Sequence, residues 1–181
     1  YYSGSSSGAA TISNNTASNN QQYGINTSSG IGTISGNTVS SNGGGGISAS
    51  QDSINIASNI VTDNTGTGIA ASGGAVISNN TIRNNTGASY GGGINARYPK
   101  SISNNTVTGN SATYRGGGIY TEYGSNAQIT SNTISNNTAP EGGGLYIHSG
   151  VSTIEYNYIT NNSGGGVYLC DGCLPTINMN D

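Results

Sequence analysis

Four residues with charged or reactive side chains recur at one position of a repeated pattern. Arg97, Glu122, His148 and Cys170 each lie three residues after the aliphatic residue of a Gly-Ile, Gly-Leu or Gly-Val pair. If these repeats stack in the fold, Glu122 and His148 become neighbours and could work as an acid–base pair. A surface ion pair of Arg97 with Glu122, beside a solvated histidine, is the simpler interpretation, and we favour it.

Carboxylates are otherwise sparse. Hydrolysis of a glycosidic bond needs two of them about 5 to 9.5 Å apart, and the seven Asp and Glu residues are spread thinly along the chain. The sequence therefore predicts no catalytic site, with Glu122 and His148 as the only candidates. It also predicts no metal ion and no cofactor.

Cys170 and Cys173, in the sequence CDGC, are the only cysteines. A metal site would need further Cys or His residues nearby, and a redox-active CxxC pair normally begins a helix, for which the sequence shows no pattern. A small disulfide loop is favoured over two free thiols. A disulfide would indicate an oxidising environment, and therefore an extracellular or cell-surface location.

Three tyrosines directly follow the same aliphatic residues, so stacked repeats would align Tyr120, Tyr146 and Tyr168 in a row. Such a row could bind sugar rings or a protein partner through its aromatic faces. Stacking of the rings on one another, which stabilises a sheet through cross-strand contacts, is the favoured role.

Hydroxyl side chains flank the central aliphatic residue of most repeats. They form two rows that resemble the Thr-x-Thr surface of ice-binding proteins, although Ile60, Arg83 and Tyr158 interrupt them. Thr and Ser also suit exposed strand positions in general, and we favour that explanation. The candidate ice-binding residues are Thr16, Thr38, Thr81, Thr106, Thr108 and Thr133.

Seven Asn-x-Ser/Thr sequons agree with an extracellular location, although a repeat rich in Asn and Thr also creates sequons by chance. Glycosylation further requires a source cell that has the machinery. The candidate glycosylation sites are Asn14, Asn26, Asn79, Asn84, Asn104, Asn136 and Asn161.

All these positions depend on a repeat that covers the chain. Its fixed part is an isoleucine, an asparagine three residues later, an aliphatic residue two further on, and a second asparagine five residues after the first. A spacer and the Gly-aliphatic pair follow. Successive copies lie 21 to 27 residues apart, because the first asparagines are Asn15, Asn37, Asn59, Asn80, Asn105, Asn132, Asn157 and Asn180.

Short Ile- and Val-rich segments separated by Asn and Gly predict strands and sharp corners. Three short strands in one such repeat correspond to one coil of a parallel β-helix. We therefore predict an all-β, single-domain parallel β-helix (solenoid) of about seven to eight coils, with asparagine ladders at its corners. Residues 1–181 form one domain, in which residues 1–11 are a partial first coil, 12–176 are seven coils, and 177–181 begin a truncated eighth.

The spacers lengthen from Ile77 onward. We expect the corner before each triple glycine to bulge outward there, over Tyr90, Tyr114, Arg115 and Glu141. Loops on one side of a solenoid are where binding sites tend to lie.

Composition excludes two classes of partner. Only 6% of the residues are charged and the net charge is -3, which leaves no basic surface for a nucleic-acid backbone. No apolar run approaches the ~20 residues that cross a bilayer as a helix, so we expect no membrane insertion by this segment. The ordered apolar spacing also distinguishes the chain from a disordered linker.

Three segments resemble a known family. GGGIY at Gly116–Tyr120, GGGLY at Gly142–Tyr146 and SNTISNNTA at Ser131–Ala139 are similar to right-handed parallel β-helix repeat proteins with a pectin-lyase-like fold. They are most similar to bacterial surface proteins of the polymorphic outer-membrane-protein and autotransporter-passenger type. Members include adhesins, structural surface proteins and polysaccharide-cleaving enzymes, so the resemblance implies a right-handed coil without fixing a function. The acidic calcium cluster of pectate-lyase-like relatives and the paired aspartates of polygalacturonase-like relatives are absent.

We therefore expect a secreted or cell-surface structural or adhesive β-solenoid. Its partners would be host or cell-surface glycans, or further copies of itself associated laterally or end to end into extracellular filaments, because both termini lie inside a repeat. A segment of a longer solenoid and a short stacking subunit both fit those termini. The alternatives are a carbohydrate-binding or polysaccharide-cleaving enzyme and an ice-binding protein.

Overall fold

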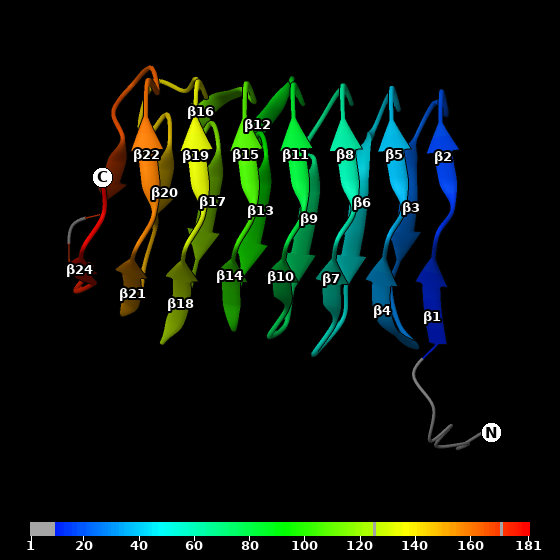
Figure 1. Cartoon of the computed structure of the whole chain (residues 1–181), viewed down its shortest axis with the longest axis horizontal. Helices are drawn as coiled ribbons and strands as arrows, with labels where there is room; N and C mark the ends of the chain where they lie inside the picture. The colour runs from blue at the N-terminus through cyan, green and yellow to red at the C-terminus, as the bar shows by residue number, and fades with distance from the viewer. Residues whose placement is uncertain (1–9, 125, 171) are drawn as a thin grey trace.

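The computed structural model describes residues 10–124, 126–170 and 172–181. Over these residues the chain winds into a parallel β-solenoid of about seven coils without a helix, which confirms the fold class predicted from the repeat (Figure 1). None of the described segments is a helix long and apolar enough to span a membrane. Residues 1–9, most of the predicted partial first coil, lie outside the described residues.

Three sheets of parallel strands run the length of the solenoid, the first and second on the near side in Figure 1 and the third behind them. The first sheet contains β1 (Ala10–Ser13), β4 (Ile31–Ser35), β7 (Asn55–Ala57), β10 (Val76–Ser78), β14 (Ser101–Ser103), β18 (Ala127–Thr130), β21 (Ser152–Glu155) and β24 (Thr176–Asn178). The second contains β2 (Thr16–Ser18), β5 (Thr38–Ser40), β8 (Ile60–Thr62), β11 (Thr81–Arg83), β15 (Thr106–Thr108), β19 (Thr133–Ser135) and β22 (Tyr158–Thr160). The third contains β3 (Tyr23–Thr27), β6 (Gly45–Ser50), β9 (Ile69–Ser72), β13 (Ile94–Arg97), β17 (Ile119–Glu122), β20 (Leu145–Ile147) and β23 (Val167–Leu169).

Each coil places its isoleucine beside the isoleucine of the neighbouring coil. In the first sheet Ile77 pairs with Ile56 on one side and with Ile102 on the other. The second sheet aligns its aliphatic residues in the same way, as Ile82 does with Val107. These side chains are fully buried, and each contributes about 1.5 to 3 kcal/mol by leaving water. The stacked aliphatic columns are therefore the core of the fold.

Two asparagine ladders run along the corners, as the repeat predicts. The amide Nδ2 of Asn105 donates to Oδ1 of Asn132 in the next coil at 3.0 Å, and the backbone N–H of Asn105 donates to the same oxygen at 3.0 Å. Nδ2 of Asn105 also donates to the carbonyl of Ile77 at 3.0 Å. The second ladder repeats this arrangement, as in the bond from Asn110 to Asn137. The ladders satisfy buried polar groups that would otherwise destabilise the corners.

The corners need residues that tolerate left-handed or crowded backbone. Asn14, Asn79 and Asn104 each have φ of 57°, a conformation that Asn adopts more readily than most residues. A Cβ atom on Gly117 would overlap the carbonyl oxygen of Thr138 in the adjacent coil, and Gly116 has φ of 63°. The triple glycines are therefore required where neighbouring coils approach closely.

The lengthened spacers form a small sheet of their own. β12 (Ala88–Tyr90) pairs in parallel with β16 (Ala112–Arg115), and a further bridge joins Arg115 to Glu141 in the next coil. The expected outward bulge is thus an ordered extension of successive coils. It lies beside the outer face of the third sheet, where Tyr90 contacts Tyr120 of β17.

Candidate functional site

A cleft lies at the bulge formed by β12, β16 and the following spacer. It is lined by Tyr90, Tyr114, Arg115, Pro140 and Glu141, and its volume is about 230 Å³. We call these five residues the tyrosine cleft. The rings of Tyr90 and Tyr114 lie 5.9 Å apart and remain 40% and 60% exposed. Two accessible aromatic faces beside polar side chains form a surface that can hold a small amphipathic ligand.

The cleft also contains an ion pair. Nε of Arg115 lies 2.8 Å from Oε2 of Glu141. This hydrogen bond raises the pKa of Arg115 above its ordinary value. The guanidinium group lies over the ring of Tyr146, 5.0 Å from its centroid, at a distance typical of a cation–π contact. Both charged groups are partly exposed, so Arg115 can still donate hydrogen bonds to a ligand and Glu141 can still accept them.

The predicted row of three tyrosines adjoins this cleft. Tyr120, Tyr146 and Tyr168 project from the outer face of β17, β20 and β23, with ring centroids 5.6 Å and 4.9 Å apart. Tyr120 and Tyr146 are only 6% and 3% exposed, whereas Tyr168 is 41% exposed. The rings therefore stack on one another, and two of the three are covered. The accessible aromatic surface at this place belongs mainly to Tyr90 and Tyr114.

Burial and, to a smaller degree, the Glu122 carboxylate raise the pKa of Tyr120 to about 12. In the unfolded chain this phenol ionises near its ordinary value of about 10. As the pH rises between these values, the unfolded state loses a proton that the folded state keeps. The free energy of unfolding therefore falls with rising pH in this window, and this contribution is constant below it.

We expect the melting temperature of the wild-type protein to fall more steeply above about pH 10 than that of the variant Tyr120→Phe. The two proteins should melt within a few degrees of each other at neutral pH, since Phe keeps the ring contacts. Thermal unfolding followed by circular dichroism across this pH range makes the comparison. If the melting temperatures of the two proteins fell in parallel with rising pH, ionisation of Tyr120 would not be the cause of the lost stability.

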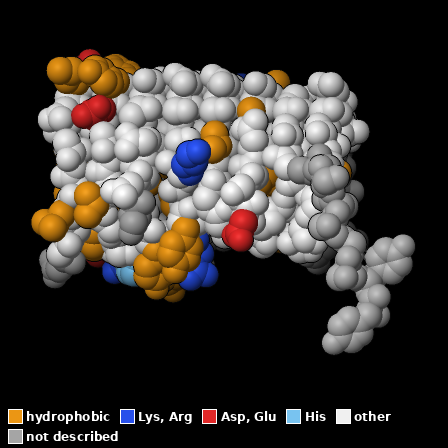
Figure 2. Space-filling model, turned by 90° about the horizontal axis from the view of Figure 1, so that it is seen from below, with side chains coloured by type: hydrophobic (Ala, Val, Ile, Leu, Met, Phe, Trp, Pro, Cys, Tyr) orange, Lys and Arg blue, Asp and Glu red, His pale blue; other side chains and the backbone are white. Residues whose placement is uncertain are grey.

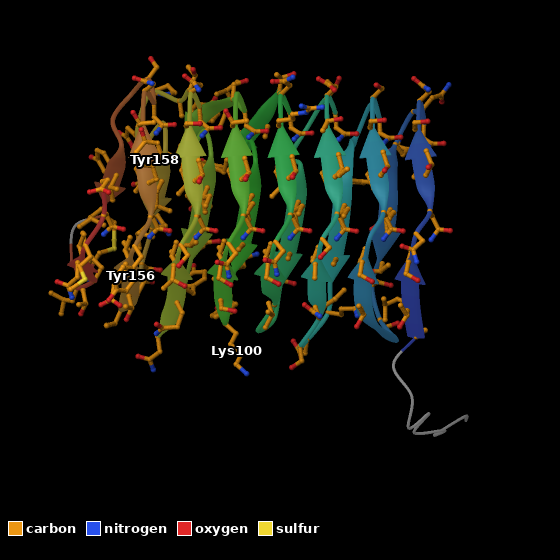
Figure 3. All side chains as sticks on the ribbon, in the orientation of Figure 1. Lys100, Tyr156 and Tyr158 are labelled. Atoms are coloured by element: carbon orange, nitrogen blue, oxygen red, sulfur yellow. A yellow bond between two sulfur atoms is a disulfide. The ribbon has the colours of Figure 1, made fainter. Side chains whose placement is uncertain are left out.

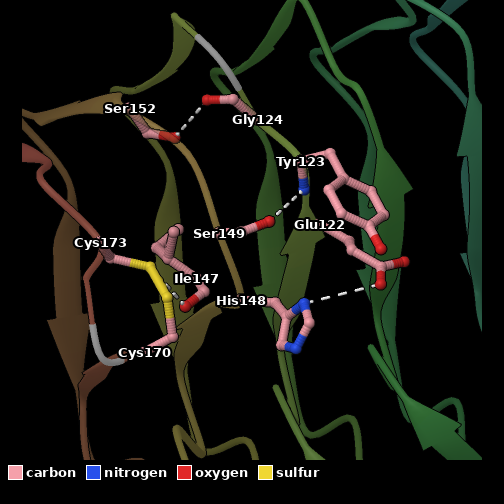
Figure 4. The surroundings of a disulfide bond; sticks show 9 residues. All are labelled: Glu122, Tyr123, Gly124, Ile147, His148, Ser149, Ser152, Cys170 and Cys173. Carbon is pink, nitrogen blue, oxygen red and sulfur yellow. Dashed lines mark hydrogen bonds and ion pairs between the residues drawn. A yellow bond between two sulfur atoms is a disulfide. The ribbon is translucent and has the colours of Figure 1, made fainter.

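Glu122 joins Arg97 and His148 across three adjacent coils, as their common position in the repeat predicts. Nε of Arg97 lies 2.9 Å from Oε2 of Glu122. On the other side, Nδ1 of His148 lies 3.5 Å from Oε1 of Glu122 (Figure 4). The second distance is long for a hydrogen bond. Each carboxylate oxygen of Glu122 thus faces a cation or a potential cation. This arrangement corresponds to the surface ion pair more closely than to a free general acid.

The two cysteines form a disulfide between Cys170 and Cys173, with Cα atoms 5.4 Å apart. The bond lies against the carbonyl of Ile147, one coil earlier, which is 3.5 Å from the sulfur of Cys173 (Figure 4). Cys173 therefore packs against β20 of the third sheet. Among the described residues, no group of three His, Cys, Asp or Glu side chains could hold a metal ion.

All seven sequon asparagines are exposed. Six of them have left-handed backbone angles at corners, whereas Asn26 lies on β3. In the six corner sequons the middle residue is a ladder asparagine, for example Asn105 after Asn104. The repeat therefore alternates an outward asparagine with an inward one. The outward set consists of Asn14, Asn79, Asn84, Asn104, Asn136 and Asn161.

The candidate ice-binding residues project outward from the second sheet in register. Thr16 pairs with Thr38, and Thr81 pairs with Thr106, which pairs with Thr133. The hydroxyl of Ser135 donates to that of Thr108 at 3.1 Å. Ile60 separates Thr38 from Thr81, and Tyr158 follows Thr133. Arg83 interrupts the second row of hydroxyl side chains, which runs parallel to the first. Strands with a hydroxyl in both rows therefore occur in no more than two successive coils of the described sheet.

Tyr98 and Tyr123 are not among the residues that the repeat pattern predicts to be functional. Both lie at the corner that follows the third sheet, with rings stacked 5.1 Å apart at an interplanar angle of 17°. They are 54% and 40% exposed. We call them the corner tyrosines. Their signal in the sequence is a shared offset, four residues after Ile94 and Ile119.

The fold combines parallel coils, inward isoleucine columns and asparagine ladders, and it gathers side chains on an outer face. These features define a right-handed β-helix repeat protein. The family model described as a right-handed beta helix region matches residues 2–96 and 26–181, and the chain belongs to this family. This membership confirms the β-helix repeat that the resemblance predicted. No curated protein and no solved structure matches the chain.

Proposed function

We propose that the chain is an extracellular or cell-surface adhesive solenoid of the polymorphic outer-membrane-protein and autotransporter-passenger type, and that it binds glycans at the tyrosine cleft. The observation that carries the proposal is the pair of exposed rings, Tyr90 and Tyr114, beside the Arg115–Glu141 ion pair in one cleft.

The chemistry of a sugar ring fits this cleft. One face of a pyranose carries C–H groups that pack against the electron-rich face of an aromatic ring. Its edge carries hydroxyl groups, which accept hydrogen bonds from a guanidinium and donate them to a carboxylate. The volume of about 230 Å³ is below the range typical of drug-sized ligands. The cleft therefore suits one or two sugar rings of a larger glycan.

Two further observations support an extracellular location. The Cys170–Cys173 disulfide is typical of proteins that work in oxidising compartments. Every sequon asparagine is exposed, so each is accessible to modification in a cell with the glycosylation machinery.

We propose that the chain binds the glycan without cleaving it. The two oxygens of Glu122 face Arg97 and His148, whereas a general acid must lie within hydrogen-bond reach of the substrate atom that it protonates. The cleft itself contains one carboxylate, Glu141, whereas hydrolysis of a glycosidic bond usually uses two.

We expect Tyr114→Ala to weaken the binding of a recognised glycan roughly tenfold, through loss of one stacking contact. Tyr114 is 60% exposed, so the fold should tolerate the change. Isothermal titration against a glycan identified on an array measures the affinity. Tyr158→Ala, which removes a 53% exposed tyrosine from the second sheet (Figure 3), is the matched control. Equal affinity of Tyr114→Ala and the wild-type protein would exclude the cleft as the binding site.

A further inference from the structure

Aromatic contacts continue from the tyrosine cleft across the third sheet. Tyr90 of the cleft lies 5.2 Å from Tyr120 on β17, and Tyr120 lies 6.1 Å from the ring of His148. The ring of His148 in turn lies 6.4 Å from that of Tyr123 in a T-shaped arrangement, and Tyr123 stacks on Tyr98. A connected set of rings thus joins the tyrosine cleft to the corner tyrosines, in the direction of the strands and across the axis of the solenoid.

The corner tyrosines lie beside the ion pairs that Glu122 forms with Arg97 and His148. The guanidinium of Arg97 lies 5.8 Å from the ring centroid of Tyr123, and its side chain is 55% exposed. Glu122 and His148 complete the polar border. Figure 2 shows hydrophobic side chains gathered beside the histidine, with basic side chains next to them, at the lower edge of that face. The corner therefore repeats the chemistry of the cleft, with aromatic faces beside Arg and Glu.

The backbone at the corner tyrosines is strained. Tyr98 and Tyr123 have φ of 52° and 56°, in the left-handed region that is unfavourable for a bulky residue. At the same position one coil earlier stands Gly73, which adopts φ of 71° without that cost. Other corners of the described chain adopt the same conformation, for example at Tyr156, so the proposal rests on the contacts of the two rings and not on their backbone angles.

We propose that the corner tyrosines are a second subsite for the same glycan, and that the bound chain lies across the third sheet along β13 and β17. This inference rests on the proposed function of the tyrosine cleft. The ligand is then an extended oligosaccharide, since a single ring could not reach both subsites.

The span between the subsites fixes the smallest ligand that uses both. β13 and β17 contain four residues each, and at about 3.3 Å per residue they cover roughly 13 Å. Tyr90 precedes β13 and Tyr114 precedes β17, whereas the corner tyrosines follow these strands. A chain of about three or four sugar rings covers this distance, with its middle rings over Asn95, Arg97 and Glu122.

The test uses the double variant Tyr98→Asn with Tyr123→Asn. Asn tolerates left-handed backbone, so the variant should fold and melt within a few degrees of the wild-type protein. The probes are cello- and chito-oligosaccharides of increasing length, whose flat, extended chains present apolar ring faces. Affinities are measured by isothermal titration. The matched control is Tyr156→Asn, the same exchange at a left-handed corner with φ of 58° on another face of the solenoid (Figure 3).

For the wild-type protein we expect the affinity to rise about tenfold between a disaccharide and a tetrasaccharide, because the second subsite is then occupied. The double variant should bind the disaccharide normally and lose this gain. Tyr156→Asn should keep it.

Three other outcomes would overturn the inference. If the wild-type protein binds the disaccharide and longer chains equally, the second subsite does not exist, although the tyrosine cleft stands. If the double variant keeps the full gain with length, the chain follows another path. If the wild-type protein binds no oligosaccharide in either series, both the proposed function and the second subsite are wrong.

Discussion

Replacing Ile129 by Asn should lower the free energy of unfolding by about 4 to 6 kcal/mol. Ile129 is fully buried on β18, between Ile102 and Ile154 of the neighbouring coils. The substitution removes a buried aliphatic side chain and leaves an amide without partners in an apolar column. Thermal and denaturant-induced unfolding measure the loss.

The matched control for this change is Ser40→Asn, which introduces the same side chain on the outward side of β5. Ser40 is only partly buried, and the variant should differ from the wild-type protein by less than about 0.5 kcal/mol. If the two variants lost similar stability, the division of strand residues into inward and outward sets would be wrong.

Asn132→Ala should cost about 3 to 5 kcal/mol, nearly as much as a change in the core. Nδ2 of Asn132 donates to Oδ1 of Asn157 at 2.9 Å, to the carbonyl of Ile102 at 2.9 Å and to that of Thr130 at 3.1 Å. Its Oδ1 accepts from both the backbone and the side chain of Asn105. Alanine would leave several of these groups buried and unpaired.

The control for the ladder is Asn26→Ala. Asn26 is exposed on β3 and lies outside both ladders, so its removal should cost less than about 0.5 kcal/mol. Comparable midpoints for Asn132→Ala and Asn26→Ala in the same denaturant titration would show that the ladder contributes little stability.

The sequence predicted the fold because a solenoid is nearly one-dimensional. Each coil contacts only its neighbours, so the spacing of Ile102 and Ile129, or of Asn105 and Asn132, already determines which residues meet. The structure places these pairs in register. The same reasoning predicted that Arg97, Glu122 and His148 would lie on successive coils.

The accessibility of the candidate site did not follow from the sequence. The row of Tyr120 and Tyr146 was predicted, but its burial depends on where the long spacers fold. The spacers carry no fixed pattern, so their pairing as β12 and β16 and the contact of Tyr90 with Tyr120 arise from packing alone. Sequence reasoning that treats the spacers as loops cannot determine which tyrosine faces remain accessible.

The corner tyrosines were missed for a different reason. Tyr98 and Tyr123 occupy a corner position, where Asn, Ser or Gly is the usual residue. A search for repeated residue types does not find them, because the same position in the preceding coil is Gly73. Their shared offset after Ile94 and Ile119 occurs in two coils only, and the stacked rings show that the two side chains lie together.

The asparagine ladders give the solenoid a polarity. In both ladders the bond between neighbouring side chains runs from Nδ2 of one asparagine to Oδ1 of the asparagine one coil toward the C-terminus, as from Asn105 to Asn132 and from Asn110 to Asn137. These amide-to-amide bonds therefore point the same way along the axis and reinforce one another. A coil that continues the fold on the C-terminal side must offer a side-chain oxygen, and one on the N-terminal side must offer an amide. Two such solenoids can therefore continue one another only head to tail, and any assembly built on this contact would have two chemically different ends.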